Sequence, residues 1–499
     1  MTRAPHVQQD RVARWLQDAL PGHLPAFLAR QRWYGGKARP IGAIAVEDIA
    51  LWGDEAPSAL VIAAVSYEGG SSERYGLLVG FDDEPGGRAV IGPTAQPGLP
   101  AWAVEATVDP ARVGSLLKGF SGAPDHPTRL GGRLRYLDVS ETAKRAVAEP
   151  TTVTPVGSEQ SNTSMRVGAS LVFKLFRRLP VGENPEVEMG RFLTSRTSFR
   201  ATPALHGSLA YGAPDGTTST LGVLQAWVPC DGDGWAYVTS HLQRALRDAS
   251  VSDELARAMV MLGGTTADFH AALASDVGTP AFRPEAIGEA DIGVWRGRFA
   301  DQASRTIDLV RRHHLTWADE ARRLAGTCLE QAGHMAALGA TGGRGTPTQL
   351  WKTRIHGDYH LGQTLKTPAG FTIIDFEGEP SRPIDERRQK HSPLRDVAGM
   401  LRSFDYAIET AGRHHPAASS TLRSSLNLRE SFLAGYLATV GRADVTSVPR
   451  DRGELEAWLG FFEFEKALYE LEYEINNRPA WVDIPLRWIV RSLEDREAL

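Results

Sequence analysis

The chain has 499 residues, enough for about three domains of ordinary size. Its net charge is −5, which argues against a surface built to bind nucleic acid. Only two cysteines occur, Cys230 and Cys328, too few for a secreted disulfide scaffold and consistent with a reducing compartment. The sequence shows neither the apolar core of a signal peptide nor a run of about 18 apolar residues. We therefore expect a cytoplasmic enzyme without a membrane or nucleic-acid partner.

Residues 1–101 are expected to form a small α/β cap. Apolar residues at helical spacing predict an amphipathic helix at its start. These residues are Val12, Trp15, Leu16 and Leu20. The runs ALVIAAVSY (59–67) and RYGLLVGF (74–81) predict strands, and the segment 91–100, rich in Pro and Gly, predicts a loop that ends the cap.

Residues 102–227 are expected to form an intermediate lobe that binds a nucleotide. Residues 151–176 are typical of three strands joined by short loops, with Lys174 on the third strand. A lysine there could neutralise nucleotide phosphates, and Glu188 in the helix that should follow could pair with it. Glu186 is the competing partner for the lysine.

Two further segments of this region could contact the nucleotide. The turn 158–164 offers Ser, Asn and Thr side chains that could cradle phosphate, whereas the sequence has no P-loop motif. A buried strand is predicted over 219–229, leading into the mostly helical residues 228–499. Backbone groups from Gln225 to Val228 would then hold the adenine, and Asp231 could reach the ribose.

Two motifs in the third region carry the candidate chemistry, IHGDYHLGQ at residues 355–363 and IIDFEGE at 373–379. Asp358 and Asp375 are only 17 residues apart, and the intervening segment predicts a turn followed by a short strand. Phosphoryl transfer needs one carboxylate to orient or deprotonate the attacking hydroxyl and further oxygen ligands for Mg²⁺. Asp358 suits the first role, and Gln363 and Asp375 suit the second.

An alternative interpretation of the first motif is a metal-dependent hydrolase. His356, Asp358 and His360 alternate as metal ligands on a strand can do. The sequence has no further His-rich element that would complete the coordination shell, so this hypothesis is the weaker one. A second alternative is a catalytically inactive relative that binds sugar or nucleotide.

The long helix predicted over 454–477 carries candidate acceptor-binding residues. Helical spacing places Glu463, Glu470 and Glu474 on one stripe, with Lys466 alongside it. Carboxylates hydrogen-bond pairs of sugar hydroxyls, and Trp481, just after the helix, could supply an aromatic face. A carboxylate stripe would also favour the ammonium of an amino sugar.

These motifs resemble the HGDxHxxN and DFE elements of the aminoglycoside phosphotransferase-like kinases, with Gln363 at the position of the Asn. The segments 27–41, 159–179 and 465–486 are similar to the actinobacterial glucosamine kinase and maltokinase group of that family. The resemblance implies an α+β, bilobal protein-kinase-like fold with a small α/β cap and a mostly helical C-terminal lobe. It implies ATP and Mg²⁺ as cofactors, Asp358 as the catalytic residue, and Asp396 as a buried support of the catalytic loop.

The resemblance also limits the acceptor to a small set. Glucosamine, phosphorylated at O6, is the leading acceptor, because the carboxylate stripe suits an ammonium. Maltose, phosphorylated at its reducing-end C1 hydroxyl, is the alternative. We expect a monomer or a weak dimer.

Overall fold

The structure, a computed structural model, describes residues 5–497 except 54–56, 123, 149–151, 158–160, 246–250, 277, 313–348, 414–421, 423–425 and 441–447. Cys328 and the first residues of the expected phosphate turn, 158–160, lie outside this part. The chain forms two compact units. The first comprises residues 1–195, 203–228 and 383–385, and the second comprises 196–202, 229–382 and 386–499.

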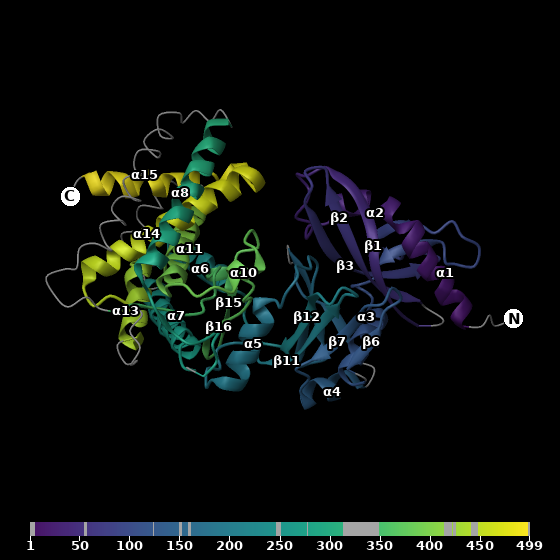
Figure 1. The fold of residues 1–499 in the computed structure, drawn as a ribbon. Coiled ribbons are helices and arrows are strands. Elements are labelled where there is room, and N and C mark those ends of the chain that lie inside the picture. Colours follow the sequence, from purple (N-terminus) through teal and green to yellow (C-terminus); the bar gives the residue numbers. More distant parts are fainter. Residues whose placement is uncertain are drawn as a thin grey trace. The chain divides into compact units, whose positions relative to one another are not determined.

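The first unit begins with two helices on a five-stranded antiparallel sheet (Figure 1). The helices are α1 (Pro5–Asp18) and α2 (Leu20–Arg30), and the strands are β1 (Ile41–Trp52), β2 (Ser58–Tyr67), β3 (Ser72–Asp82), β4 (Val90–Pro93) and β5 (Trp102–Glu105). The sheet order is β1-β2-β3-β5-β4. Val12, Trp15, Leu16 and Leu20 are all buried, as their spacing predicts. The expected single helix is divided at Ala19, because Pro21 suits the first turn of a new helix.

A seven-stranded sheet completes the first unit, in the order β6-β7-β11-β12-β10-β9-β8. Its strands are β6 (Asp125–Pro127), β7 (Arg133–Leu137), β8 (Val153–Pro155), β9 (Asn162–Val167), β10 (Leu171–Phe176), β11 (Leu205–Gly212) and β12 (Thr218–Ala226). Its helical elements are α3 (Pro110–Leu117), η1 (Lys118–Phe120), α4 (Glu141–Ala148) and α5 (Pro185–Arg196). The three strands expected within 151–176 are β8, β9 and β10, with Lys174 on the third.

The two sheets of the first unit share one hydrophobic core. Leu60, Ile62 and Leu78 of the first sheet belong to the same cluster as Phe173 and Val223 of the second, and all of them are buried. Strand β5 belongs to the first sheet although it begins at Trp102, after the expected end of the cap at residue 101. One apolar face of the first sheet therefore belongs to this common core, and its other face packs on α1 and α2.

The second unit is mostly helical. Its main helices are α6 (Gly234–Ala245), α7 (Val251–Leu273), α8 (Glu289–Arg312), α11 (Leu394–Gly412), α13 (Leu428–Val440), α14 (Arg452–Asn477) and α15 (Asp483–Glu497). Helix α14 is the predicted C-terminal helix and packs against both α8 and α11 (Figure 1). Two short antiparallel pairs are present, β13 (Glu285–Ala286) with β14 (Trp351–Lys352) and β15 (Thr364–Thr367) with β16 (Gly370–Ile373).

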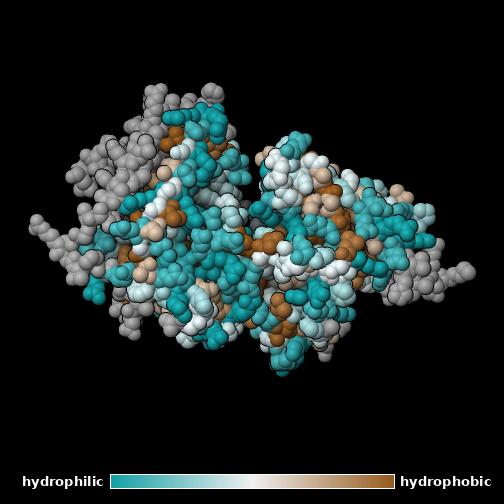
Figure 2. All heavy atoms as spheres, viewed as in Figure 1, coloured by the Kyte–Doolittle hydropathy of each residue, from teal (hydrophilic) through white to brown (hydrophobic). Residues whose placement is uncertain are grey.

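The surface drawn in Figure 2 is largely hydrophilic, with hydrophobic residues in small separate groups. Within the described ranges, the helices are all too short or too polar to traverse a bilayer.

Candidate active site

The hairpin β15–β16 brings two of the predicted metal ligands together. Gln363 directly precedes β15, and the main chain N–H of Ile374, after β16, donates to the Gln363 carbonyl oxygen at 3.0 Å. The side-chain amide of Gln363 donates to Oδ2 of Asp375 at 2.9 Å. Asp375 has a φ of 68°, a left-handed conformation that few non-glycine residues adopt and that recurs at functional sites. The hairpin thus places the amide group of Gln363 beside the carboxylate of Asp375.

The loop that carries Asp358 is held by the buried Asp396, in the first turn of α11. The two carboxylate oxygens of Asp396 accept from the N–H groups of His356 at 2.7 Å and Gly357 at 2.9 Å. His270 lies 3.2 Å from the same carboxylate and 2.9 Å from the hydroxyl of Tyr436. Burial alone would raise the pKa of Asp396, but His270 and the backbone donors hold it below its ordinary value. The ionised carboxylate therefore fixes the loop backbone.

The histidine side chains in this loop are in hydrogen-bond contact with backbone groups of the protein. Nε2 of His356 lies 2.9 Å from the carbonyl oxygen of Ile374, which ties the loop to the residue before Asp375. Nδ1 of His360 accepts from the N–H of Gly362 at 3.1 Å. The described ranges contain no group of three His, Cys, Asp or Glu side chains arranged to hold a metal ion. The geometry therefore gives no support to the hydrolase alternative.

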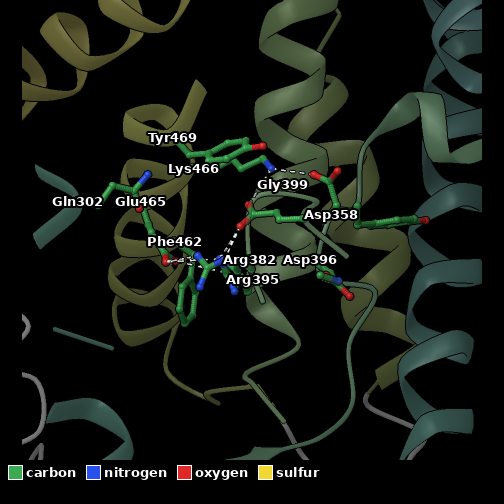
Figure 3. Close-up of a pocket in the computed structure, with 13 residues that line it drawn as sticks. Gln302, Asp358, Arg382, Arg395, Asp396, Gly399, Phe462, Glu465, Lys466 and Tyr469 are labelled. Atoms are coloured by element: carbon green, nitrogen blue, oxygen red, sulfur yellow. Dashed lines mark hydrogen bonds and ion pairs between the residues drawn. The ribbon is translucent and has the colours of Figure 1, made fainter. Parts of the chain in front are cut away.

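Asp358 is held by a lysine from α14. The ammonium of Lys466 lies 2.9 Å from Oδ1 of Asp358 and 3.1 Å from Oε1 of Glu379, and it sits over the ring of Tyr469 (Figure 3). Burial would lower the pKa of Lys466, but the two carboxylates raise it well above its ordinary value. Lys466 is therefore a fixed cation at the candidate catalytic carboxylate.

Beneath this pair lies a network of buried charges. Glu379 accepts from Nε of Arg382 at 2.5 Å and lies 3.4 Å from Arg395, and both arginines also pair with Glu465 (Figure 3). Burial would raise the pKa of Glu379, but Lys466 and the two arginines hold it well below its ordinary value. Together with Asp358, these side chains line one pocket of the second unit.

The three glutamates expected to contact the acceptor are all in ion pairs with arginines. Glu470 accepts from Arg402 at 2.6 Å, and Glu474 accepts from Arg478 at 2.6 Å. Glu463 pairs with Arg429 of α13. Burial raises the pKa of each of these three glutamates above its ordinary value, although the arginines oppose the shift. Their role toward the acceptor stays a prediction.

Trp481 lies in the short helix η3 (Pro479–Trp481), as an aromatic face just after α14. The guanidinium groups of Arg413 and Arg478 lie 4.6 Å and 5.3 Å from its ring centre. The indole is therefore already in contact with two cations, and its contact with a sugar stays a prediction.

The predicted nucleotide residues lie at several places in the chain. Lys174 is buried in β10, between Ser164 of β9 and Val223 of β12. Glu186 and Glu188, the two candidate partners of Lys174, are both buried in the first turn of α5.

The expected adenine and ribose contacts lie near the end of the first unit. The side chain of Gln225 donates to Glu186 at 2.9 Å, and the N–H of Trp227 donates to the carbonyl oxygen of Ser170. Val228 is the last residue of this segment in the first unit. The N–H of Asp231, in the second unit, donates to the carbonyl oxygen of Lys366. The nucleotide contacts of these residues stay predictions.

The contact between Lys466 and Asp358 and the network around Glu379 are not predicted by the sequence. Helical spacing placed Lys466 beside the acidic stripe, but its partners are 87 and 108 residues away in the chain. The only sequence signal is an excess of charge in FEGE, at residues 376–379, and in the arginines that follow.

The fold is of the protein-kinase-like type, and its second unit carries the carboxylate loop of Asp358 and a hairpin with the amide of Gln363 and the carboxylate of Asp375. The chain belongs to the phosphotransferase enzyme family, whose model matches residues 152–411. Residues 27–109 match the maltokinase N-terminal cap domain. The resemblance found in the sequence, and the expected fold, are thereby confirmed.

Two individual proteins similar to this chain share less than a third of its residues over the aligned segments. The chain is 28% identical to the glucosamine kinase of Streptacidiphilus jiangxiensis over 333 residues, which are 66% of this chain and 70% of that protein. It is 26% identical to the glucosamine kinase of Mycolicibacterium smegmatis over 336 residues, 66% of this chain and 77% of that protein. A structure of glucosamine kinase with glucosamine, ADP and inorganic phosphate superposes with a TM-score of 0.61 and 21% identity, covering 93% of this chain and 98% of that one.

Proposed function

We propose that the protein is an ATP-dependent sugar kinase. The observation that carries this proposal is the ion pair of Asp358 with Lys466, on a loop that His356 ties to Ile374, the residue before Asp375. A catalytic carboxylate must be oriented before the acceptor hydroxyl arrives, and Lys466 fixes one oxygen of Asp358 while the other is left to meet the hydroxyl.

In the proposed reaction, Asp358 accepts a hydrogen bond from the acceptor hydroxyl and takes its proton. The sugar oxygen forms a bond to the γ-phosphorus of ATP, and the bond between that phosphorus and the oxygen of ADP breaks. Asp396 keeps the loop of Asp358 in place through the N–H groups of His356 and Gly357. These residues position the acceptor and receive its proton.

The donor atoms at the hairpin fit a magnesium ion. An amide oxygen and a carboxylate are hard ligands of the kind that Mg²⁺ prefers, and the side chains of Gln363 and Asp375 lie in contact, through the amide nitrogen of Gln363. To bind the ion together with Asp375, the Gln363 amide would turn its oxygen toward it. When bound, the ion would neutralise charge on the transferred phosphates.

The predicted nucleotide contacts are also part of this proposal. Lys174 would neutralise the α- and β-phosphates, with Glu188 or Glu186 as its partner, and the segment from Gln225 to Val228 would hold the adenine. Asp231 would reach the ribose. We also propose that the protein is cytoplasmic and is a monomer or a weak dimer.

Glucosamine is the leading acceptor, because two relatives at 28% and 26% identity and a structural neighbour with glucosamine bound are named glucosamine kinases. Phosphorylation would then occur at O6.

Maltose is a second candidate, favoured by the charges around Asp358. Lys466 places an ammonium at the reacting carboxylate, and the three glutamates expected to recognise an amino group are paired with arginines. A neutral sugar would avoid repulsion by Lys466. The match of residues 27–109 to a maltokinase cap agrees with this candidate.

The test is ADP release from ATP and Mg²⁺ with glucosamine, glucose, N-acetylglucosamine, maltose or kanamycin, with Asp358→Asn as the blank. Turnover of glucosamine alone supports the leading acceptor, and turnover of maltose alone replaces it with the second. Loss of turnover in Asp358→Asn by orders of magnitude, with ATP binding retained, is expected. Binding of ATP without turnover of any sugar would contradict the kinase proposal and favour the inactive relative.

A further inference from the structure

A buried arginine connects the cap to the strands that carry the predicted nucleotide residues. Arg177 directly follows β10, three residues after Lys174, and only 1% of its surface is exposed. Its Nε donates to the hydroxyl of Thr163 at 2.8 Å. Its Nη2 donates to Oε1 of Glu105 at 3.0 Å and to the hydroxyl of Thr107 at 3.1 Å. Such a guanidinium is strongly directional, because its donors lie in one plane.

On the cap side, the partners of Arg177 are themselves fixed. Glu105 ends β5, and its second oxygen accepts from the hydroxyl of Thr107 at 2.5 Å and from the Thr107 N–H at 3.2 Å. The guanidinium also lies 4.9 Å from the ring centre of Trp33. The carboxylate and the indole thus hold the guanidinium from two sides.

Trp33 belongs to the motif QRWYGG, residues 31–36, for which the kinase chemistry gives no role. A Cβ added to Gly36 would collide with the hydroxyl of Tyr67, so the motif packs closely on the cap sheet. Within this motif, Trp33 packs on Phe27 and Tyr75 and faces the guanidinium of Arg177.

On the nucleotide side, Arg177 reaches the beginning of β9. Thr163 is the second residue of β9 and pairs with Leu175 of β10. It lies in the segment 158–164 that the sequence predicts to contact phosphate. Arg177 therefore fixes where β9 begins relative to the cap and to the strand of Lys174.

We infer that Arg177 is a positioning residue through which the cap sets the affinity for the nucleotide. It acts by holding Thr163, and with it the start of β9, at the place that nucleotide binding requires. This inference rests on the proposed kinase function, because it assigns β9 and β10 to ATP binding. It gives the cap a role in the kinase reaction without any contact between cap and substrate.

The experiment compares Arg177→Met and Glu105→Gln with Tyr211→Phe in the full chain. Tyr211→Phe removes another hydrogen bond between the two sheets, from the Tyr211 hydroxyl to the buried Asp48 at 2.9 Å, and leaves Thr163 untouched. The readouts are the Kd of ATP with Mg²⁺ by titration calorimetry, KM and kcat for both substrates, and the melting temperature.

Arg177→Met is expected to weaken ATP binding about tenfold, and Glu105→Gln by a smaller factor in the same direction. The kcat at saturating ATP and the KM of the sugar should change by less than about twofold. Tyr211→Phe should keep the wild-type Kd for ATP. If Arg177→Met does not fold, the comparison of the Kd for ATP in Glu105→Gln with that in Tyr211→Phe tests the inference.

Two results would overturn the inference alone. They are an unchanged Kd in the Arg177 and Glu105 variants, and an equal loss of affinity in Tyr211→Phe. Failure of the wild-type protein to bind ATP would instead overturn the proposed function, and this inference with it.

Discussion

The ammonium of Lys466 contacts Oδ1 of Asp358 at 2.9 Å, across 108 residues of chain. Lys466→Met is expected to lower kcat about tenfold or more, because the carboxylate loses the cation that orients it. Steady-state kinetics with both substrates would measure this. Lys466→Arg, which keeps the charge, should retain more activity than the Met variant. An unchanged kcat in Lys466→Met would show that the ion pair with Asp358 does not contribute to the rate of the reaction.

Gln363 should determine how much Mg²⁺ the enzyme needs. Gln363→Leu removes the amide group that contacts Asp375, and with it the proposed oxygen ligand, and is expected to raise the Mg²⁺ concentration for half-maximal activity about tenfold or more. Gln363→Glu keeps an oxygen ligand and serves as the control. The measurement is a Mg²⁺ titration of ADP release at saturating ATP. If the Leu variant gives the wild-type curve, Gln363 is not a ligand.

Glu470 supports a buried arginine, whatever its contact with sugar. Arg402 is fully buried, so Glu470→Gln should cost about 3 kcal/mol in the free energy of unfolding, because the guanidinium loses its closest carboxylate. Urea denaturation would measure this. The control is Glu456→Gln on the same helix, where the pair with Arg452 is exposed and the change should be below about 1 kcal/mol. Equal effects in the two variants would contradict the structural role.

Stability should fall in acid because of Glu379. Its pKa is lower in the folded protein than the ordinary value of 4.5, so its ionised form stabilises the fold above that pH. This contribution is lost as the pH falls below 4.5 toward the folded-state value. In Glu379→Gln the midpoint of urea unfolding should be lower at neutral pH and should depend less on pH in acid. Parallel curves for the two proteins would contradict this assignment.

Local patterns were enough to predict much of the fold. As predicted, Lys174 is on β10 and the acidic helix α5 follows it. Such elements can be predicted because the periodicity of a strand or a helix depends only on residues close together in the sequence. Helix α14 spans Arg452–Asn477, close to the predicted 454–477, since Asp451 caps its start and Pro479 follows its end. The turn and the strand before Asp375 were also predicted, from a Pro and a Gly before an apolar run, whereas β15 (Thr364–Thr367) was not and overlaps the expected turn.

The charge pairing could not be predicted from the sequence. The acidic stripe of α14 is present, but Arg402 and Arg429, which neutralise two of its members, come from α11 and α13. Helical spacing indicates which side chains share a face, and it contains no information on what a distant segment brings to that face. The division of the first helix at Ala19 was missed because the apolar spacing continues through Leu20.

The core shared by the two sheets of the first unit has a consequence for shortened proteins. A chain begun after β5 would leave the residues that face Leu60, Ile62 and Leu78 in water, at about 1.5–3 kcal/mol for each large side chain. Such a fragment should be poorly soluble during expression, because an apolar sheet face promotes aggregation. A deletion that removes the cap would therefore also remove part of the core that covers the sheet of Lys174.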